Sequence, residues 1–303
     1  MEQFMTMTGR NLKIYFRDRG AVFFSLLSML IVILLMVFFL GDMYMEATVS
    51  LLNEFAGQSA AVNKEDVDLL ILVWNFAGIL SINAVTVTLA VYSVMIKDRV
   101  TGKLNSIYTA PVSRGIITAG YMAAAWVASV LVCTLTLFIT EICGIMKGLT
   151  VFSFVTHLQL LGLIAVNSFV YAAFMYLLAM AARTEAAWSG IGTVIGTLVG
   201  FLGGIYIPIG SLSKTIGSLM KCTPIIYGTS MFRNIMTKEI METVFLGVPE
   251  EIIEAYRIEM GIHLEIFDRA IGVTEEWLGL LVCGILLLIA GIMVLKYGKK
   301  ADR

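Results

Sequence analysis

Residue types that catalyse reactions or bind metals are sparse in this sequence of 303 residues. The two histidines, His157 and His263, have no Cys, Asp or Glu at the spacing of a metal site, which predicts structural roles for both. The sequence contains no G-x-x-x-x-G-K-S/T motif for binding phosphate, so we do not expect the chain to hydrolyse ATP by itself. These patterns predict no catalytic, metal or cofactor-binding residue in the chain.

The long apolar runs also lack nucleophile–base pairs and charged relays. Their serines have no His or Lys partner at the same depth, which argues against an intramembrane serine protease. No Asp, Lys or Arg lies inside the runs and Glu141 is at a boundary, which disfavours a proton- or ion-coupled carrier. The four cysteines show no C-x-x-C spacing, although a Cys143–Cys222 bridge outside the membrane stays open.

The elements that carry these residues are hydrophobic enough to cross a membrane. Hydrophobic residues make up 59% of the chain and charged residues 14%, with a mean hydropathy of +0.90. A helix needs about 20 apolar residues to cross the bilayer core. Runs of that length lie near 21–41, 69–96, 116–141, 157–182, 187–207 and 278–295. We therefore expect an all-α, polytopic bundle of six transmembrane helices, forming a single domain over residues 1–303.

The placement of charge predicts the orientation of the bundle. The net charge is −1, which gives no general attraction to nucleic acid. Short cytoplasmic connections are enriched in Lys and Arg. Basic residues cluster before the first run, between the second and third, and after the sixth. We expect a multi-pass protein of the cell membrane with both termini in the cytoplasm and with residues 208–277 as a long outer connection.

Residues 1–20 favour an interfacial helix ahead of the first span. Apolar residues Phe4, Met5, Leu12, Tyr15 and Phe16 fall near one helical face, and the basic residues lie off it. Such a helix lies at the surface of the lipid bilayer. The alternative is a solvated basic segment that only sets the topology.

A short cytoplasmic helix is predicted over residues 101–111. Thr101 is a suitable N-cap, Pro111 ends the helix, and Ser113 is placed to cap the third span. An apolar stripe runs along one face of this helix and consists of Leu104, Ile107, Tyr108 and Pro111. The stripe predicts a partner protein or the membrane surface as its contact, or else packing against the cytoplasmic ends of the same bundle.

Small and mildly polar residues mark the second and fifth spans. The fifth span carries Gly192, Gly196, Gly200 and Gly204, a spacing that allows close helix packing either within the chain or with a second copy. Candidate residues for a substrate path are Asn75, Asn83, Thr86, Thr193 and Thr197, and hydrogen bonding between helices is the alternative role.

In the outer connection, residues 212–235 are predicted to form short broken helices that dip into the bilayer. Residues 249–260 are predicted to form a surface helix.

The order of these parts resembles a known family. After the second span come an acid–base pair, a glycine, an apolar residue and a terminal Pro-Val-Ser-Arg. In this chain these residues are Asp98, Arg99, Gly102, Leu104, Pro111, Ser113 and Arg114. Asp98 stands where members often have Glu, and Ala110 separates Thr109 from Pro111. The whole chain resembles the permease subunit of bacterial ATP-binding-cassette transporters of the type-2 exporter class.

The resemblance implies a role for each of these places. Helix 101–111 would be the coupling helix that docks on a separate ATPase subunit, which holds the ATP and Mg²⁺. The permease would pair with a second copy or a homologue, with the first and fifth spans near the contact and the second and fifth beside the path. The expected function is export across the cytoplasmic membrane by a non-enzymatic permease subunit. A secondary carrier or channel without an ATPase is the alternative class, and a membrane enzyme or scaffold is the third.

Overall fold

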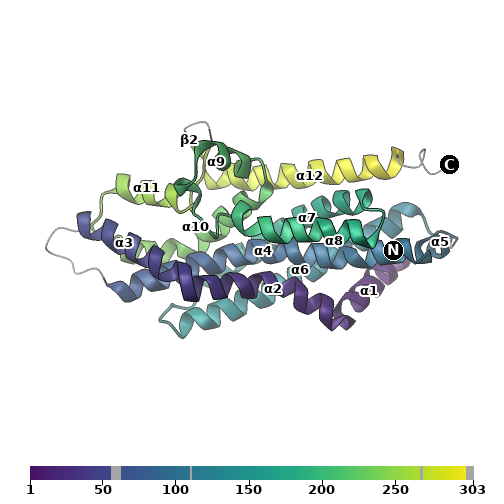
Figure 1. Cartoon of the computed structure of the whole chain (residues 1–303), viewed down its shortest axis with the longest axis horizontal. Coiled ribbons are helices and arrows are strands. Elements are labelled where there is room, and N and C mark those ends of the chain that lie inside the picture. Colours follow the sequence, from purple (N-terminus) through teal and green to yellow (C-terminus); the bar gives the residue numbers. More distant parts are fainter. Residues whose placement is uncertain (56–62, 110, 267–268, 298–303) are drawn as a thin grey trace.

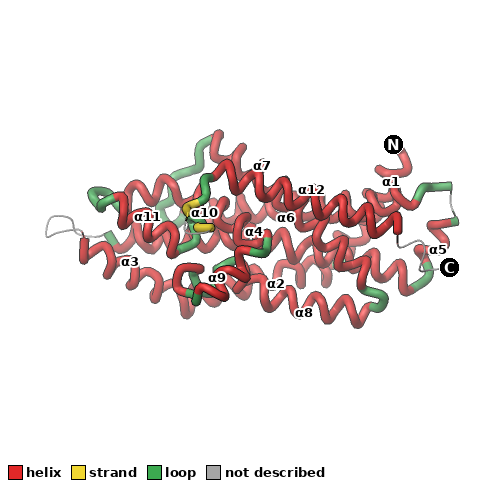
Figure 2. Tube along the Cα trace, turned by 90° about the horizontal axis from the view of Figure 1, so that it is seen from above, coloured by secondary structure: helices red, strands yellow, loops and turns green. Residues whose placement is uncertain are grey.

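The computed structural model describes residues 1–55, 63–109, 111–266 and 269–297. Almost all of these residues are helical, and the helices run along the long axis of an elongated bundle (Figure 1). The strands in the described part are β1 (Glu265–Ile266) and β2 (Arg269–Ala270), a short antiparallel pair (Figure 2). The prediction of an all-α polytopic bundle is confirmed.

Six helices in the described part are long and apolar enough to cross a membrane, as the hydropathy pattern predicts. The first is continuous over residues 19–54. The others are α4 (Lys64–Val100), α6 (Arg114–Ile145), α7 (Phe154–Ala181), α8 (Glu185–Leu202) and α12 (Val273–Tyr297). Helix α4 is the centre of the bundle, since 83% of its most apolar window is buried and it packs against α2, α6, α7, α8 and α10.

The first spanning helix extends beyond the range near 21–41 that the sequence predicts. It comprises α2 (Arg19–Leu35), a π-helical turn over Met36–Leu40 and α3 (Gly41–Phe55). Gly41 is suited to this turn, because a Cβ there would lie 2.7 Å from the carbonyl oxygen of Met36. The helix thus continues through Gly41 by way of the π-helical turn.

Helix α1 (Glu2–Arg17) packs beside the start of the bundle, mainly against α6. The face it buries contains Met7, Thr8, Asn11 and Tyr15. Of the five predicted apolar residues, Met5 and Phe16 are exposed, Phe4 and Leu12 are half-buried and Tyr15 is buried. One face of the helix therefore packs against α6. The exposed apolar residues lie outside this contact, in an arrangement that suits a helix at a lipid surface.

The long connection after α8 folds into a cap on the bundle. It contains a 3₁₀ turn, η2 (Ile209–Ser211), followed by α9 (Lys214–Lys221), α10 (Pro224–Val244) and α11 (Glu250–Glu259). Pro224 lies in the first turn of α10, where its missing N–H costs nothing. Helix α10 packs deeply against α4 and α7 and places this connection on the bundle rather than in solvent.

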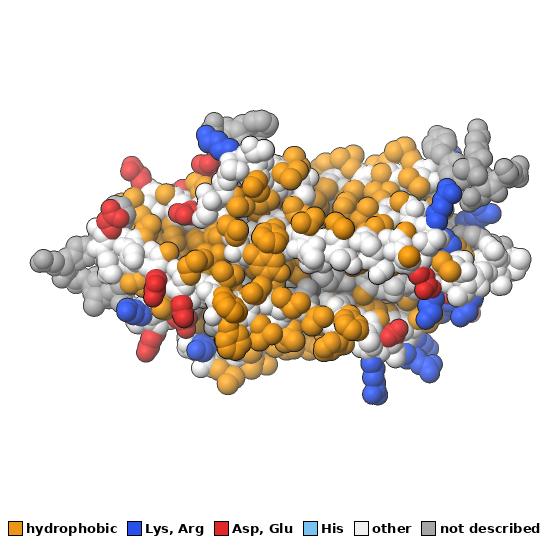
Figure 3. Space-filling view, viewed as in Figure 1, with side chains coloured by type: hydrophobic (Ala, Val, Ile, Leu, Met, Phe, Trp, Pro, Cys, Tyr) orange, Lys and Arg blue, Asp and Glu red, His pale blue; other side chains and the backbone are white. Residues whose placement is uncertain are grey.

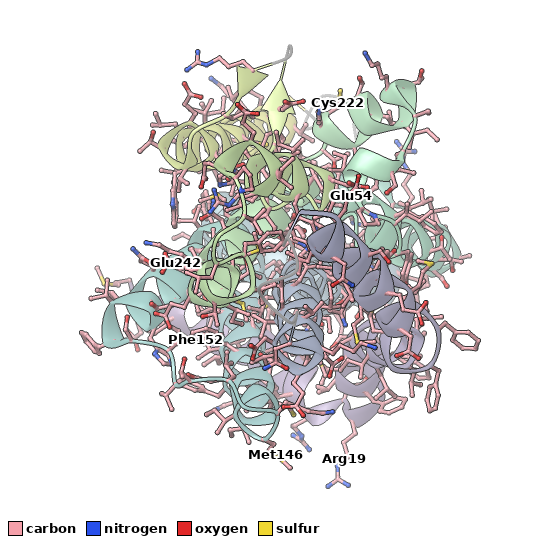
Figure 4. The ribbon with its side chains drawn as sticks, turned by 90° about the vertical axis from the view of Figure 1, so that its left-hand side faces the viewer. Arg19, Glu54, Met146, Phe152, Cys222 and Glu242 are labelled. Atoms are coloured by element: carbon pink, nitrogen blue, oxygen red, sulfur yellow. The ribbon has the colours of Figure 1, made fainter. Side chains whose placement is uncertain are left out.

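Charged side chains separate toward the two ends of the molecule. Figure 3 shows them at both ends of the visible face, with a band of hydrophobic side chains between. The α5 end, meaning the end with α1, α5 (Lys103–Tyr108) and the last turn of α4, lies opposite the end with α3 and α11 (Figure 1). Figure 4 looks onto the α11 end, where Phe152 and Glu242, on one side of the bundle, line a pocket of about 540 Å³.

Candidate functional site

The predicted short helix over 101–111 is present as α5 and is shorter, spanning Lys103–Tyr108. Thr101 does not cap it: its hydroxyl donates to the carbonyl oxygen of Lys97 at the end of α4, 2.7 Å away. The junction is made by Gly102, whose φ of 74° is in the left-handed region that glycine readily adopts. Ala110 and the side chain of Tyr108 lie outside the described residues.

The apolar stripe of α5 contacts the bundle of the same chain. Leu104 is 8% exposed, and the half-buried Ile107 packs against the same hydrophobic core. The rest of the helix is open, since Lys103, Asn105 and Ser106 are exposed. Pro111, which the sequence predicts as part of the stripe, lies beyond α5 and is exposed. Helix α5 is therefore anchored by its apolar side and presents a mostly polar surface beyond the bundle.

Asp98, one turn before α5, is the centre of a buried polar cluster. Arg10 on α1 donates two hydrogen bonds to its carboxylate, at 2.7 and 2.9 Å, and the hydroxyl of Tyr121 on α6 donates a third at 2.6 Å. Hydrogen bonding to Asp98 raises the pKa of Arg10, so the guanidinium stays charged. These bonds join α1, α4 and α6 at a single carboxylate that is 4% exposed.

Arg99 points to a different helix from Asp98. Its guanidinium donates to the carbonyl oxygens of Ala179 and Ala182 at 3.0 and 2.6 Å, at the carboxyl end of α7. A cation at this position compensates the free carbonyls and the negative end of the helix dipole. The two residues of the acid–base pair therefore do not bond to each other and connect α4 to three separate helices.

The segment after α5 is also held in place. The hydroxyl of Ser113 accepts a hydrogen bond from the backbone N–H of Ile116 at 3.3 Å and caps α6, as predicted. Gln3 on α1 donates to the carbonyl oxygen of Pro111 at 3.4 Å. Arg114 is exposed and is the first residue of α6. Both ends of the α5 segment are thus connected to neighbouring helices.

A groove of about 850 Å³ lies between α2, α4 and α8. The views in Figures 1 and 2 agree in placing α2 and α8 beside α4. Three of the residues predicted for a substrate path, Thr86, Thr193 and Thr197, line the groove. Its remaining walls combine hydroxyl groups with apolar side chains such as Phe24 and Leu89.

The other two path candidates lie in the interior of the bundle. The amide of Asn83 donates to the hydroxyl of Thr136 at 2.9 Å and so joins α4 to α6. Asn75 is 2% exposed, and its side-chain oxygen has no hydrogen-bond partner in the described part of the chain. Neither residue lines the groove, so the structure separates the five candidates into a groove-lining set and an interior set.

The glycines of the fifth span also fall into two groups. Gly192 and Gly196 line the groove, and nothing lies within 4 Å of a Cβ placed on Gly196. Gly200 packs against the ring of Tyr206, and Gly204, with a φ of 61°, lies in the turn after α8 ends at Leu202. The helix therefore ends before the predicted 207. Gly196 leaves an open surface, whereas a Cβ on Gly192 would contact Leu89 of α4 at 3.4 Å.

Arg233 on α10 is a buried residue that the sequence reasoning missed. Its guanidinium donates to the carbonyl oxygens of Gly204 and Met260 at 2.8 and 3.1 Å and lies 3.9 Å from the centre of the Trp74 ring. A buried cation needs such partners. Its only sequence signal is a lone Arg in the apolar part of α10, because the partners are backbone groups and a ring far away in the chain.

Both histidines lie within hydrogen-bonding distance of an acid, which local spacing could not reveal. His157 pairs with Glu141 at 2.9 Å and joins α6 to α7, and His263 pairs with Glu254 at 2.7 Å. Each contact involves one histidine and one acid, and no cluster of three metal-ligating side chains occurs among the described residues. All four cysteines, including Cys143 and Cys222, are free.

Comparison with known proteins agrees with this architecture. The sequence model of the ABC-2 type transporter family matches residues 2–237, which include α1, the groove and α5. No curated protein matches the chain. The match covers well over half of the chain, and with the six spanning helices it shows that this protein belongs to the ABC-2 type transporter family and is a multi-pass membrane permease of an ABC transporter.

Proposed function

We propose that this permease is the membrane subunit of an ATP-driven exporter and that a separate ATPase subunit docks on the exposed face of α5. Family membership supports an ABC ATPase as a partner in general. The chain itself has no phosphate-binding motif. The proposal therefore assigns ATP and Mg²⁺ to the partner subunit and transport to this chain.

The observation that carries this proposal is the way α5 is mounted. Its apolar side is anchored through Leu104, and its polar side projects beyond the bundle. The adjacent residues Asp98 and Arg99 contact α1, α6 and α7. A displacement of α5 by a partner is therefore transmitted directly to four helices, including α4 at the centre of the bundle. This is the mechanical connection that an energy-coupling element requires.

The distribution of charge supports a cytoplasmic position for the α5 end. The basic residues of α1 and of the α4–α6 connection lie there, in keeping with the enrichment of Lys and Arg in cytoplasmic connections. Arg19, at the start of α2, points away from the bundle (Figure 4). Because α12 runs toward the same end, both termini are assigned to the cytoplasm and the protein to the cell membrane.

The open surfaces of α2 and α8 support a paired permease. The most apolar windows of the first and fifth spans are 19% and 17% buried within the chain. The sixth span is equally open, at 17%, but the face of α2 and α8 also carries the groove. Gly196 leaves room for a close helix contact. A second copy or a homologue placed on this face would cover the groove and form a path together with it, with residues 1–303 acting as one permease domain.

The docking proposal is tested by Ser106→Trp on the exposed face of α5. A bulky ring there blocks a close-fitting partner and leaves the buried Leu104 contact intact, so we expect ATPase co-purification to fall to background. Ser218→Trp on α9 is the matched control, since Ser218 is an exposed serine in a short helix at a different place. Both variants should reach the membrane in normal amounts.

Two results would contradict the proposal. One is undiminished ATPase co-purification with the Ser106→Trp variant. The other is substrate movement by the purified chain alone in liposomes under an ion gradient, which would favour the secondary carrier or channel.

A further inference from the structure

The groove between α2, α4 and α8 adjoins a smaller pocket at the α5 end. This pocket has a volume of about 190 Å³ and shares Asp18, Ala21, Ser93 and Lys97 with the groove. It adds Lys103, from the start of α5, to the lining. The two spaces adjoin at the four shared residues, so charged side chains gather at one end of a largely apolar groove.

The charged end carries both basic and acidic side chains. Lys97 and Lys103 are exposed cations, and Asp18 and Glu185 are exposed acids. Arg10 and Asp98 also line the pocket, and their mutual ion pair compensates their charges. Asp18 and Lys97 line both spaces, Glu185 lines the groove and Lys103 lines the smaller pocket. One carboxylate oxygen of Asp18 accepts a hydrogen bond from the backbone N–H of Ala21, and none of the four charges is compensated by an ion pair within the described residues.

The length of the site matches a lipid tail. The lining runs from Asp18 to Ile31 on α2 and from Glu185 to Thr197 on α8. At the rise of an α-helix these stretches are about 18–20 Å long. One leaflet of a bilayer has a hydrocarbon depth of about 15 Å, half of the core. The charged groups lie where the spans begin or end, which is the depth of lipid head groups.

We propose that this groove binds a zwitterionic phospholipid of the cytoplasmic leaflet. Lys97 and Lys103 contact its phosphate, and Asp18 and Glu185 contact its amine. One acyl chain lies along the apolar wall beside Phe24 and Leu89. Lysine is a common point-charge ligand for phosphate, and an ammonium group pairs with carboxylates. The identification of this lipid as cargo rests on the proposed exporter function, whereas its binding to the groove does not.

Head-group selectivity tests the proposal without an ATPase. The purified permease is offered phosphatidylethanolamine, phosphatidylglycerol and a trimethylammonium lipid with the same acyl chains, and bound lipid is quantified by native mass spectrometry. We expect a preference for phosphatidylethanolamine. Glu185→Gln should shift the preference toward phosphatidylglycerol, and Lys97→Gln should shift it toward the cationic lipid. Each shift should be about three- to fivefold, as expected for an exposed charge contact.

Two further variants separate the groove from the rest of the surface. Thr193→Trp should lower binding of all three lipids, because the ring fills the groove. Glu239→Gln, in the pocket at the α11 end, should leave the preference unchanged. Equal binding of the three lipids, shifts in the same direction for the two charge variants, or full binding by Thr193→Trp would overturn the inference. Opposite shifts in head-group preference between the two charge variants cannot come from misfolding. A failure to capture an ATPase would refute the exporter proposal and leave the lipid site untouched.

Discussion

Asp98 is a buried carboxylate whose charge is compensated by partners on two other helices. A buried ion needs both an opposite charge and hydrogen bonds to offset its lost hydration. Arg10 supplies the charge, and Tyr121 supplies a further hydrogen bond. The position of the last turn of α4, and hence of α5, depends on these two side chains.

Arg10→Gln tests this dependence. The substitution leaves Asp98 buried without a cation, at a cost of about 1–3 kcal/mol. We expect weaker packing of α1 and a lower ratio of transport to ATP hydrolysis, with α5 still able to bind the ATPase. The reconstituted complex provides both rates. Arg17→Gln is the control, since Arg17 is exposed on the same helix, and an equal loss in both variants would contradict the role of Asp98.

Arg233 is a second buried charged residue, and it lies in the cap that the connection after α8 forms. Its planar guanidinium reaches two carbonyl oxygens and the face of Trp74 at the same time, which a lysine ammonium cannot reproduce. Arg233→Lys should therefore lower the melting temperature of the purified protein and leave ATPase co-purification unchanged. Lys238→Arg, at an exposed position on α10, should alter neither property. A melting temperature equal to the wild type would refute this role.

At the scale of the element, α5 depends on the backbone of Gly102. Its φ of 74° costs about 1–2 kcal/mol for a residue with a side chain. Gly102→Ala should therefore displace α5 and reduce substrate-stimulated ATP hydrolysis by the complex. Gly9→Ala is the control, because Gly9 is helical and a Cβ there meets nothing within 4 Å. Loss of activity in the control, or none in Gly102→Ala, would contradict the account.

The elements that local sequence determines could be predicted, and those set by distant contacts could not. The six spans follow from hydropathy, and the Ser113 cap from its place before an apolar run. The first helix continues beyond the predicted range near 21–41 through a π-helical turn, which the hydropathy pattern does not reveal. The partners of Asp98 and Arg99 could not be found, since they lie on other helices. Arg10 is 88 residues from Asp98, and Ala179 is 80 residues from Arg99.

The apolar stripe of α5 is another case in which the sequence could not identify the contact partner. The sequence indicates that Leu104 and Ile107 need a contact and leaves open which one. The structure places that contact in the chain's own bundle, so the surface left for a partner is the polar face. Among the predicted path residues, Thr193 and Thr197 on α8 line the groove, because few other helices of the chain cover α8.

At the scale of the whole molecule, the open face of α2 and α8 predicts the geometry of the assembly. Val194 is 56% exposed on α8, whereas Leu286 is 60% exposed on α12. In a background without native cysteines, Val194→Cys should form a disulfide-linked dimer in native membranes, and Leu286→Cys should not. A disulfide-linked dimer of the Leu286→Cys variant alone would contradict this prediction, because it would place the contact between permeases on α12 and not on α2 and α8.

The most direct test of the central claim is a photo-crosslinking amino acid at position 105, on the exposed face of α5, in native membranes. The account predicts an adduct with an ATPase that carries a G-x-x-x-x-G-K-S/T motif, identified by mass spectrometry. The same amino acid at position 246, which is 83% exposed beyond the end of α10, should give no such adduct. Absence of the ATPase adduct at position 105, or its presence at 246, would contradict the account.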